Sequence, residues 1–211
     1  NRGLVVGSVR CVEVTGCFPG YGVLSRRDRD SDPHGGVLML CRNGMTIAGE
    51  INICKHAERC WCMVHTNRGP IALCTWYRPP GESVEAIDSL AHEYDDISAD
   101  CVGALILGDM NIHHSSWLRY SNVAASVAGS TLHDVCDQRG LVQLVKEPTR
   151  ENYLLDLALT NLGSSCIVSI LPRIADHAIV KCSINLDIDS PVTAPRRVLD
   201  YKFADVEGLQ N

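Results

Sequence analysis

Short apolar runs separated by turn residues recur along the first third of the chain. Four runs of strand length occupy residues 35–41, 45–53, 60–66 and 69–77, and residues 67–70 (NRGP) have the composition of a turn. Apolar runs of this length between turn residues are typical of β-strands. The pattern therefore predicts a series of sequential, antiparallel strands.

Two segments show helical spacing instead. Apolar residues over 84–97 recur at intervals of three and four with acidic residues between them, and Ser83 is a candidate N-cap. A second helix is predicted over 131–139, with Ser130 at its start and Gly140 at its end.

The second half of the chain contains four more apolar runs. Residues 101–108 are entirely small or apolar, which predicts a central strand, and the runs 153–160, 166–171 and 178–186 predict the last strands. Many strands with about two helices between them indicate an α/β fold of two packed sheets flanked by helices. In such a layout the loops at one edge of the sheets collect the functional site.

Length and composition fit one domain. The chain has 211 residues, of which 45% are hydrophobic, enough for a single core. We expect this domain to span residues 1–188, with its N-terminal part incomplete because the sequence begins at Asn1 rather than Met. Residues 189–197 are rich in proline and polar residues, which predicts a linker over 189–211.

The charge of the chain argues against a protein that passively coats DNA. Its net charge is −6, whereas such proteins are basic because Lys and Arg neutralise phosphates. An acidic balance is compatible with an enzyme that meets phosphate through a divalent metal. The sequence shows no membrane-spanning run and no secretory signal. Its 11 cysteines include no C-x-x-C pair, so we interpret them as buried, reduced residues.

Polar residues interrupt the apolar pattern at the end of the predicted central strand. Asp109 and Asn111 stand two residues apart, and on an extended strand such residues project to the same side. A carboxylate can hold a cation or orient a water, and an amide can donate to a phosphate oxygen. The alternative is an ordinary turn after a strand, because Gly, Asp and Asn are common turn residues.

A second group of polar residues lies near the last strands. Asp156 is the single charge in the run YLLDLALTN, so it needs a partner such as an imidazole unless it caps an exposed strand face. Asp176 and His177 directly precede the final apolar run. A carboxylate partner can orient a histidine ring and raise its pKa, which makes His177 a candidate acid or base.

The loop between the fourth strand and the first helix carries further candidates. Tyr77 and Arg78 precede two prolines that stiffen the chain, and both side chains suit a phosphate group, although both could equally be packing or surface residues. His113 and His114 are adjacent, so on an extended chain they point in opposite directions. We interpret them as loop-packing or substrate-contact residues.

The ordered set of motifs resembles the exonuclease–endonuclease–phosphatase superfamily, and within it the endonuclease domain of non-LTR (LINE-type) retrotransposon polyproteins. The resemblance covers most of residues 18–209. It rests on the segments FPGYGVLSRRDR, HGGVLML, WYRPP, GDMNIHHSSW, EPTRENYLLDLALTN and IADHAIV, and on the tail VLDYKFADVEGL. It implies a four-layered α/β sandwich and Mg²⁺-dependent cleavage of a DNA phosphodiester, with Mn²⁺ as a substitute ion. It also implies a reverse transcriptase domain downstream in the same polyprotein, and action on target DNA in the nucleus.

The resemblance assigns roles to the candidate residues. Asp109 corresponds to the aspartate that positions or deprotonates the attacking water, and Asn111 to the asparagine that holds the phosphate. His177 corresponds to the histidine that acts on the scissile phosphate, and Asp156 to the aspartate that orients it. Further correspondences are Tyr77 at the phosphate and Asp176 near the metal. Outside these correspondences, Arg78, His113, Thr149 and Arg150 are candidate DNA contacts.

The sequence departs from the family pattern at the N-terminus. Glu13 is the candidate for the family's metal-binding glutamate, but it stands closer to the PGY segment than the pattern requires. Two smaller departures are Met110 in place of an aromatic residue and Ala175 in place of a serine. A DNA-nicking endonuclease is the leading hypothesis. The alternatives are a phosphoesterase of the same superfamily acting on a lipid or nucleotide, and a truncated relic without activity.

Overall fold

The structure is a computed structural model. It describes residues 18–29, 35–43, 49–51, 58–121, 126–173 and 175–185, together with the backbone of residues 5–7. The candidate ligand Glu13 and the linker predicted over 189–211 lie outside them.

A six-stranded sheet forms the centre of the fold. Its strand order is β4 (Gly49–Ile51), β5 (Arg59–Thr66), β6 (Gly69–Trp76), β7 (Gly103–Asp109), β9 (Asp156–Thr160) and β8 (Val142–Gln143). β6 and β7 run parallel, and the other neighbouring pairs are antiparallel. The prediction that the apolar run at 101–108 forms a central strand is confirmed, because β7 lies between β6 and β9.

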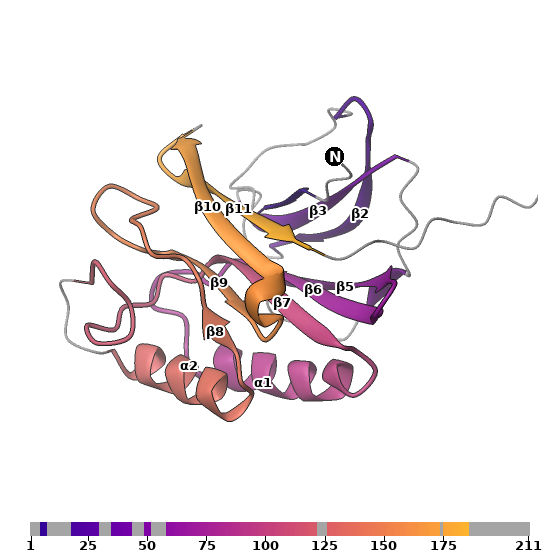
Figure 1. The fold of residues 1–211 in the computed structure, drawn as a ribbon. Helices are drawn as coiled ribbons and strands as arrows, with labels where there is room; N and C mark the ends of the chain where they lie inside the picture. Colours follow the sequence, from indigo (N-terminus) through magenta and orange to yellow (C-terminus); the bar gives the residue numbers. More distant parts are fainter. Residues whose placement is uncertain are drawn as a thin grey trace, which may run out of the picture.

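Two smaller sheets cover one face of the central sheet. One contains β1 (Val5–Gly7), β3 (Gly36–Arg42) and β2 (Tyr21–Asp28), and the other is the hairpin of β10 (Cys166–Arg173) and β11 (Ala178–Ile184). Figure 1 shows both above the β5–β6–β7–β9 region. The prediction of one continuous strand series from residue 35 to residue 77 is wrong at its start. β3 pairs with β1 and β2 in the smaller sheet, because periodicity within a strand does not reveal its partner.

Two helices lie side by side on the opposite face of the central sheet (Figure 1). α1 covers Glu85–Ser98, and its N-cap is Val84, which makes no side-chain capping bond, so the prediction of Ser83 as N-cap is wrong. α2 covers Val127–Gln138 and begins earlier than predicted. Its cap is Ser126 rather than Ser130, and the Ser126 hydroxyl accepts a hydrogen bond of 3.0 Å from the Gly129 backbone N–H.

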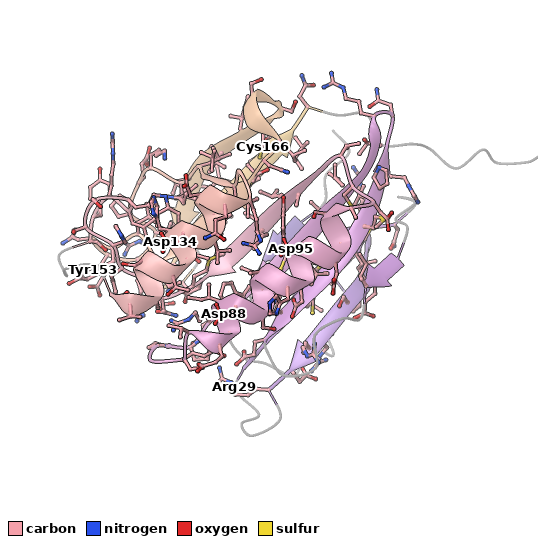
Figure 2. All side chains as sticks on the ribbon, turned by 90° about the horizontal axis from the view of Figure 1, so that it is seen from below. Arg29, Asp88, Asp95, Asp134, Tyr153 and Cys166 are labelled. Atoms are coloured by element: carbon pink, nitrogen blue, oxygen red, sulfur yellow. The ribbon has the colours of Figure 1, made fainter. Side chains whose placement is uncertain are left out.

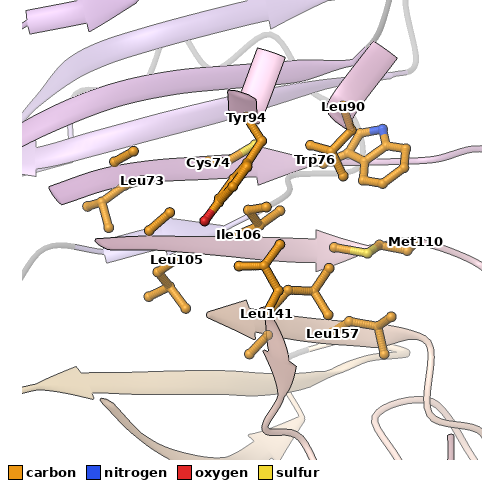
Figure 3. Packing of buried hydrophobic residues seen from close by; sticks show 14 of the residues in the cluster. Leu73, Cys74, Trp76, Leu90, Tyr94, Leu105, Ile106, Met110, Leu141 and Leu157 are labelled. Carbon is orange, nitrogen blue, oxygen red and sulfur yellow. The ribbon is translucent and has the colours of Figure 1, made fainter. Parts of the chain in front are cut away.

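The hydrophobic core lies between the helices and the central sheet. Leu90 and Tyr94 of α1 point toward β6 and β7, and Ile106 of β7 is completely buried (Figure 3). Arg59 and Glu93 form a buried ion pair with a 2.7 Å contact between Nε and Oε2. The Trp61 indole N–H donates to the same carboxylate over 2.7 Å. Such a pair is costly to break, because removal of one partner leaves a buried charge, so it ties α1 to β5.

These layers confirm the predicted fold class, an α/β sandwich with two packed sheets. The acidic residues Asp88 and Asp95 of α1 and Asp134 of α2 are labelled on the outer side of the helices in Figure 2.

Cys62 is buried, and burial raises the pKa of its thiol to about 12, consistent with a packing role. Within the described part of the chain, no helix is long and apolar enough to cross a membrane.

Candidate active site

The candidate site lies where β7 and β9 pair at their ends. Asp109 is the last residue of β7 and is directly opposite Asp156, the first residue of β9. His177 approaches from just before β11. Its Nδ1 lies 2.7 Å from Asp156 Oδ2, and its Nε2 lies 3.9 Å from Asp109 Oδ2. Three residues predicted from distant parts of the sequence therefore converge on one point.

The two carboxylates set the electrostatics of His177. The hydrogen bond that the imidazole donates to Asp156 raises the pKa of the imidazole above its ordinary value, with further contributions from the charges of Asp156, Asp109 and Asp176. Partial burial opposes this change but does not outweigh it. The ring is half-buried, and Asp156 holds one nitrogen in a fixed direction. The other nitrogen faces Asp109.

The backbone around Gly108 explains why a glycine precedes Asp109. Its φ of +150° belongs to a region that favours glycine, and a Cβ atom built there would lie 1.8 Å from the backbone oxygen of Trp76. The absence of a side chain lets the ends of β6 and β7 approach closely. The Arg78 backbone N–H then donates to the Asp109 carbonyl over 2.9 Å. The WYRPP loop is thereby fixed against the aspartate.

Asn111 does not continue the strand. Strand β7 ends at Asp109 and the φ of Asn111 is +47°, so Asn111 does not have the extended backbone from which a shared side was predicted. The Asn111 backbone N–H donates to Asp109 Oδ1 over 3.3 Å, and its side-chain amide donates to the Arg78 carbonyl over 2.9 Å. The side chain thus links the two loops that border the site.

Tyr77 is buried beside the same edge. Its backbone N–H donates to the Glu58 carbonyl over 2.9 Å, and the Arg29 guanidinium carbon lies 5.6 Å from the centre of its ring. Arg78 is only 3% exposed, and its guanidinium donates to the Glu82 carbonyl. Burial lowers the pKa of Arg78 and raises that of Glu82. The position of Arg78 favours a role in shaping the loop over the predicted contact with substrate.

Thr149 lies in the interior rather than on the surface. It is fully buried, so the expectation that its side chain touches DNA is wrong. Its hydroxyl accepts hydrogen bonds from the backbone N–H groups of Leu155 and Asp156, at 3.2 and 3.1 Å, and its carbonyl accepts one from Ala178 at 2.7 Å. Thr149 therefore connects the strand that carries Asp156 to the strand that follows His177.

Asp176 and Arg150 form an ion pair outside the carboxylate–histidine cluster. Arg150 Nη2 lies 3.3 Å from Asp176 Oδ2, and both side chains are substantially exposed. His113 packs against Tyr153, which pairs with Arg150 through the backbone. Its ring meets Tyr153 edge to face, with 6.0 Å between ring centres, and its Nδ1 lies 3.2 Å from the Ser121 hydroxyl. Contacts of Arg150 and His113 with DNA stay predictions.

The described residues do not form a complete cation site. Among them, no group of three or more His, Cys, Asp or Glu side chains is arranged to hold a metal ion. Asp109 offers hard oxygen ligands of the kind that Mg²⁺ prefers, but Asp176 pairs with Arg150 instead of joining it.

Two contributors to the site, Arg29 and Glu58, were not found by reading the sequence, and a third, Thr149, was given a different role. Arg29 stands in the charged run RRDRDSD, which resembles a solvated loop, and Glu58 stands just before an apolar strand. Both nevertheless lie beside Tyr77. The buried connecting role of Thr149 had no signal in the pattern, because an isolated threonine in a polar loop is usually exposed.

Solved structures of similar fold identify the fold class of the chain. The endonuclease domain of TRAS1, a telomere-specific non-LTR retrotransposon, matches with a TM-score of 0.67 and 15% identity over 80% of each chain. The catalytic domain of Xenopus laevis APE2 matches with a TM-score of 0.61 and 14% identity, over 85% of this chain and 78% of that one. An AP endonuclease from Archaeoglobus fulgidus matches with a TM-score of 0.55 and 15% identity, over 79% of this chain and 80% of that one. The fold is thus that of the exonuclease–endonuclease–phosphatase class.

The family follows from the sequence itself. The model of the endonuclease–reverse transcriptase family matches residues 71–181, which is more than half of the 211 residues. The chain belongs to this family, and the predicted resemblance to retrotransposon endonucleases is confirmed. A comparison with curated protein sequences finds no match.

Proposed function

We propose that the chain is a divalent-cation-dependent endonuclease that hydrolyses a phosphodiester and nicks target DNA. Membership of the endonuclease–reverse transcriptase family supports an endonuclease, and nucleases of this superfamily generally use divalent metals. We place the nicking step in a polyprotein that also contains a reverse transcriptase, acting on DNA in the nucleus. A nick leaves a DNA end from which such an enzyme could copy.

The convergence of Asp109, Asp156 and His177 carries the proposal. Hydrolysis of a phosphodiester needs a water aligned for attack and stabilisation of the charge that develops on the phosphate. Asp109 is buried and is held by the rigid end of β7, so its carboxylate can orient a water and accept its proton. His177 is oriented by Asp156 over 2.7 Å.

The raised pKa of His177 defines its role in the proposed reaction. An imidazole hydrogen-bonded to one carboxylate and facing another stays protonated at higher pH than a free histidine. Protonated His177 can donate a hydrogen bond to a non-bridging phosphate oxygen and stabilise the negative charge. We assign Tyr77 to the same phosphate, on the strength of its position beside the Asp109 loop. A bound divalent cation would supply additional positive charge against the phosphate.

The experiment is plasmid nicking by the full chain. Supercoiled DNA is incubated with the protein and Mg²⁺ or Mn²⁺, and conversion to the open circle is measured for the native protein and for Asp109→Ala and His177→Ala. We expect the native protein to nick the plasmid and a metal chelator to stop this reaction. Each variant should nick at least about a hundredfold more slowly. Release of product from small phosphoesters without plasmid nicking would favour the lipid or nucleotide phosphoesterase. No activity on either substrate from a folded chain would favour the relic.

A further inference from the structure

A buried polar bridge connects Tyr77 to the smaller three-stranded sheet. Arg29, labelled in Figure 2, follows the end of β2, and its Nε donates to Glu58 Oε1 over 2.6 Å. Glu58 precedes β5 of the central sheet. The bridge therefore joins residues from the two packed sheets, at a point where the resemblance to known endonucleases assigns no functional residue.

Tyr77 contacts both members of this bridge. The Arg29 guanidinium lies over the Tyr77 ring at 5.6 Å, and the Tyr77 side chain is a further hydrogen-bond partner of Arg29. The Glu58 carbonyl accepts the Tyr77 backbone N–H over 2.9 Å. Both the backbone and the ring of Tyr77 are thus held by the Arg29–Glu58 pair.

The pair is held more tightly than a surface ion pair. The side chain of Glu58 is 10% exposed and that of Arg29 is 25% exposed. The hydrogen bond that Arg29 donates to Glu58 raises the pKa of the guanidinium despite partial burial. Glu58 Oε2 is buried and has no hydrogen-bond partner among the described residues, so Arg29 is the group that balances this carboxylate. A side chain in such a pair has few alternative positions.

Gly35 leaves the space that Arg29 occupies. A Cβ atom built on Gly35 would lie 2.5 Å from Arg29 Cζ and 2.7 Å from its Nε. A side chain at this position would push the guanidinium away from its place. The absence of a side chain at Gly35 thus fits the observed position of the Arg29 guanidinium. The hydrogen bond to Glu58 places the guanidinium at the same position.

We propose that Arg29 and Glu58 are positioning residues for Tyr77, and that they fix its hydroxyl group for contact with the scissile phosphate. The inference rests on the proposed phosphodiesterase function for the identity of the ligand. The ion pair acts through Tyr77 and not through its own contact with DNA. A cation over the face of an aromatic ring restricts the ring, and a hydrogen bond to the hydroxyl oxygen sets its direction.

The first test measures Tyr77 itself, without activity. The full chain is labelled with 3-fluorotyrosine, and the Tyr77 resonance in the ¹⁹F NMR spectrum is assigned by its loss in Tyr77→Phe. We expect Arg29→Ala and Glu58→Gln to shift or broaden this resonance. The matched control is Arg26→Ala, which removes a guanidinium paired with Asp28 at 2.7 Å on the exposed part of β2 and should leave the resonance unchanged. A Tyr77 resonance that does not respond to Arg29→Ala would overturn the proposal.

The second test is a double-mutant cycle on nicking. In single-turnover reactions with saturating DNA, Arg29→Ala should slow nicking about tenfold when Tyr77 is present, and less than about twofold in the Tyr77→Phe background. An equal loss in both backgrounds would show that Arg29 acts independently of Tyr77, and would overturn the inference. If the native chain does not nick DNA, the proposed function fails, and the ¹⁹F test still decides whether the pair positions Tyr77.

Two further variants separate positioning from folding. Gly35→Ala keeps every charge but displaces the guanidinium, so it should shift the Tyr77 resonance in the same way and slow nicking to a smaller extent. Absence of both effects would contradict the inferred position of Arg29. Should Arg29→Ala fail to fold because Glu58 is left unpaired, the neutral pair Arg29→Gln with Glu58→Gln replaces it in both tests.

Discussion

The two sides of the candidate site are built differently. Asp109 and Asp156 stand on paired strands of the central sheet, whose strands β7 and β9 consist mainly of buried residues. His177 precedes β11, whose one partner strand among the described residues is β10, and along β11 exposed residues alternate with partly buried ones. The carboxylates thus have a rigid support, while the histidine depends on a two-stranded hairpin whose partly buried side chains, among them Val180 and Cys182, pack against the core. Precision in such a site is set by the less supported side.

The largest effect is expected where the rigid side would be broken. Gly108→Ala would place a methyl group against the Trp76 carbonyl, at 1.8 Å, in a backbone conformation that alanine avoids. We expect the free energy of unfolding to fall by more than about 3 kcal/mol, together with loss of nicking. Urea denaturation measures the change. Gly140→Ala is the control, since that glycine also has positive φ but has open space around it. Equal losses in the two variants would show that the close approach of β6 and β7 is unimportant.

The second largest effect is expected from a change at Thr149, which links the two sides of the site. Thr149→Val removes the hydroxyl that accepts hydrogen bonds from the Leu155 and Asp156 N–H groups, and leaves both donors without this partner. We expect a loss of about 1–3 kcal/mol in unfolding free energy, and slower nicking because Asp156 and His177 lose their common anchor. Thr149→Ser retains the hydroxyl and should lose less of both. Equal losses in the valine and serine variants would contradict a leading role for the hydroxyl, because serine lacks only the methyl group and valine lacks only the hydroxyl.

A third prediction concerns pH. Asp156, Asp109 and Asp176 all favour protonated His177, so its folded-state pKa lies above the unfolded value of about 6.5. Arg150, which pairs with Asp176, is the nearby cation. A raised folded-state pKa adds stability that is fully present below pH about 6.5 and is lost as the pH rises through the folded-state value. Proposed nicking should decline over the same rise.

The measurement is an NMR titration of the His177 ring in the full chain without added metal. Asp156→Asn should lower the pKa of His177 and weaken the pH dependence of stability above pH about 6.5. The control variant is Asp134→Asn, because Asp134 contacts His133, at 3.8 Å, and not His177; it should leave the His177 titration unchanged. An unchanged His177 titration in the variant would show that Asp156 does not control the charge of this ring.

The smallest effect is expected at the outer ion pair. Arg150→Ala removes the contact with Asp176, and because both side chains are exposed, the unfolding free energy should change by less than about 1 kcal/mol. Thermal denaturation at low and high salt measures it. A larger loss would mean that this pair, and not Thr149, holds the start of β11.

The sequence was informative where a residue's type and its local pattern agree. The apolar run before Asp109 predicted the central strand, and the lone charge at Asp156 predicted its imidazole partner. Pairing between distant segments was not predictable in the same way. β3 has the pattern of its neighbours along the chain but joins another sheet, and Arg29 looks solvated until the fold places it over Tyr77. Such contacts depend on tertiary packing, which local periodicity does not encode.

The isolation of the β10–β11 hairpin has a consequence for heat inactivation. Because neither strand pairs with another strand in the described part of the chain, the hairpin can open while the central sheet stays folded. Each opening would carry His177 away from two carboxylates that remain in place. Backbone amides of β11 should therefore exchange with deuterium faster than those of β7, and activity should disappear several degrees below the temperature at which the core melts.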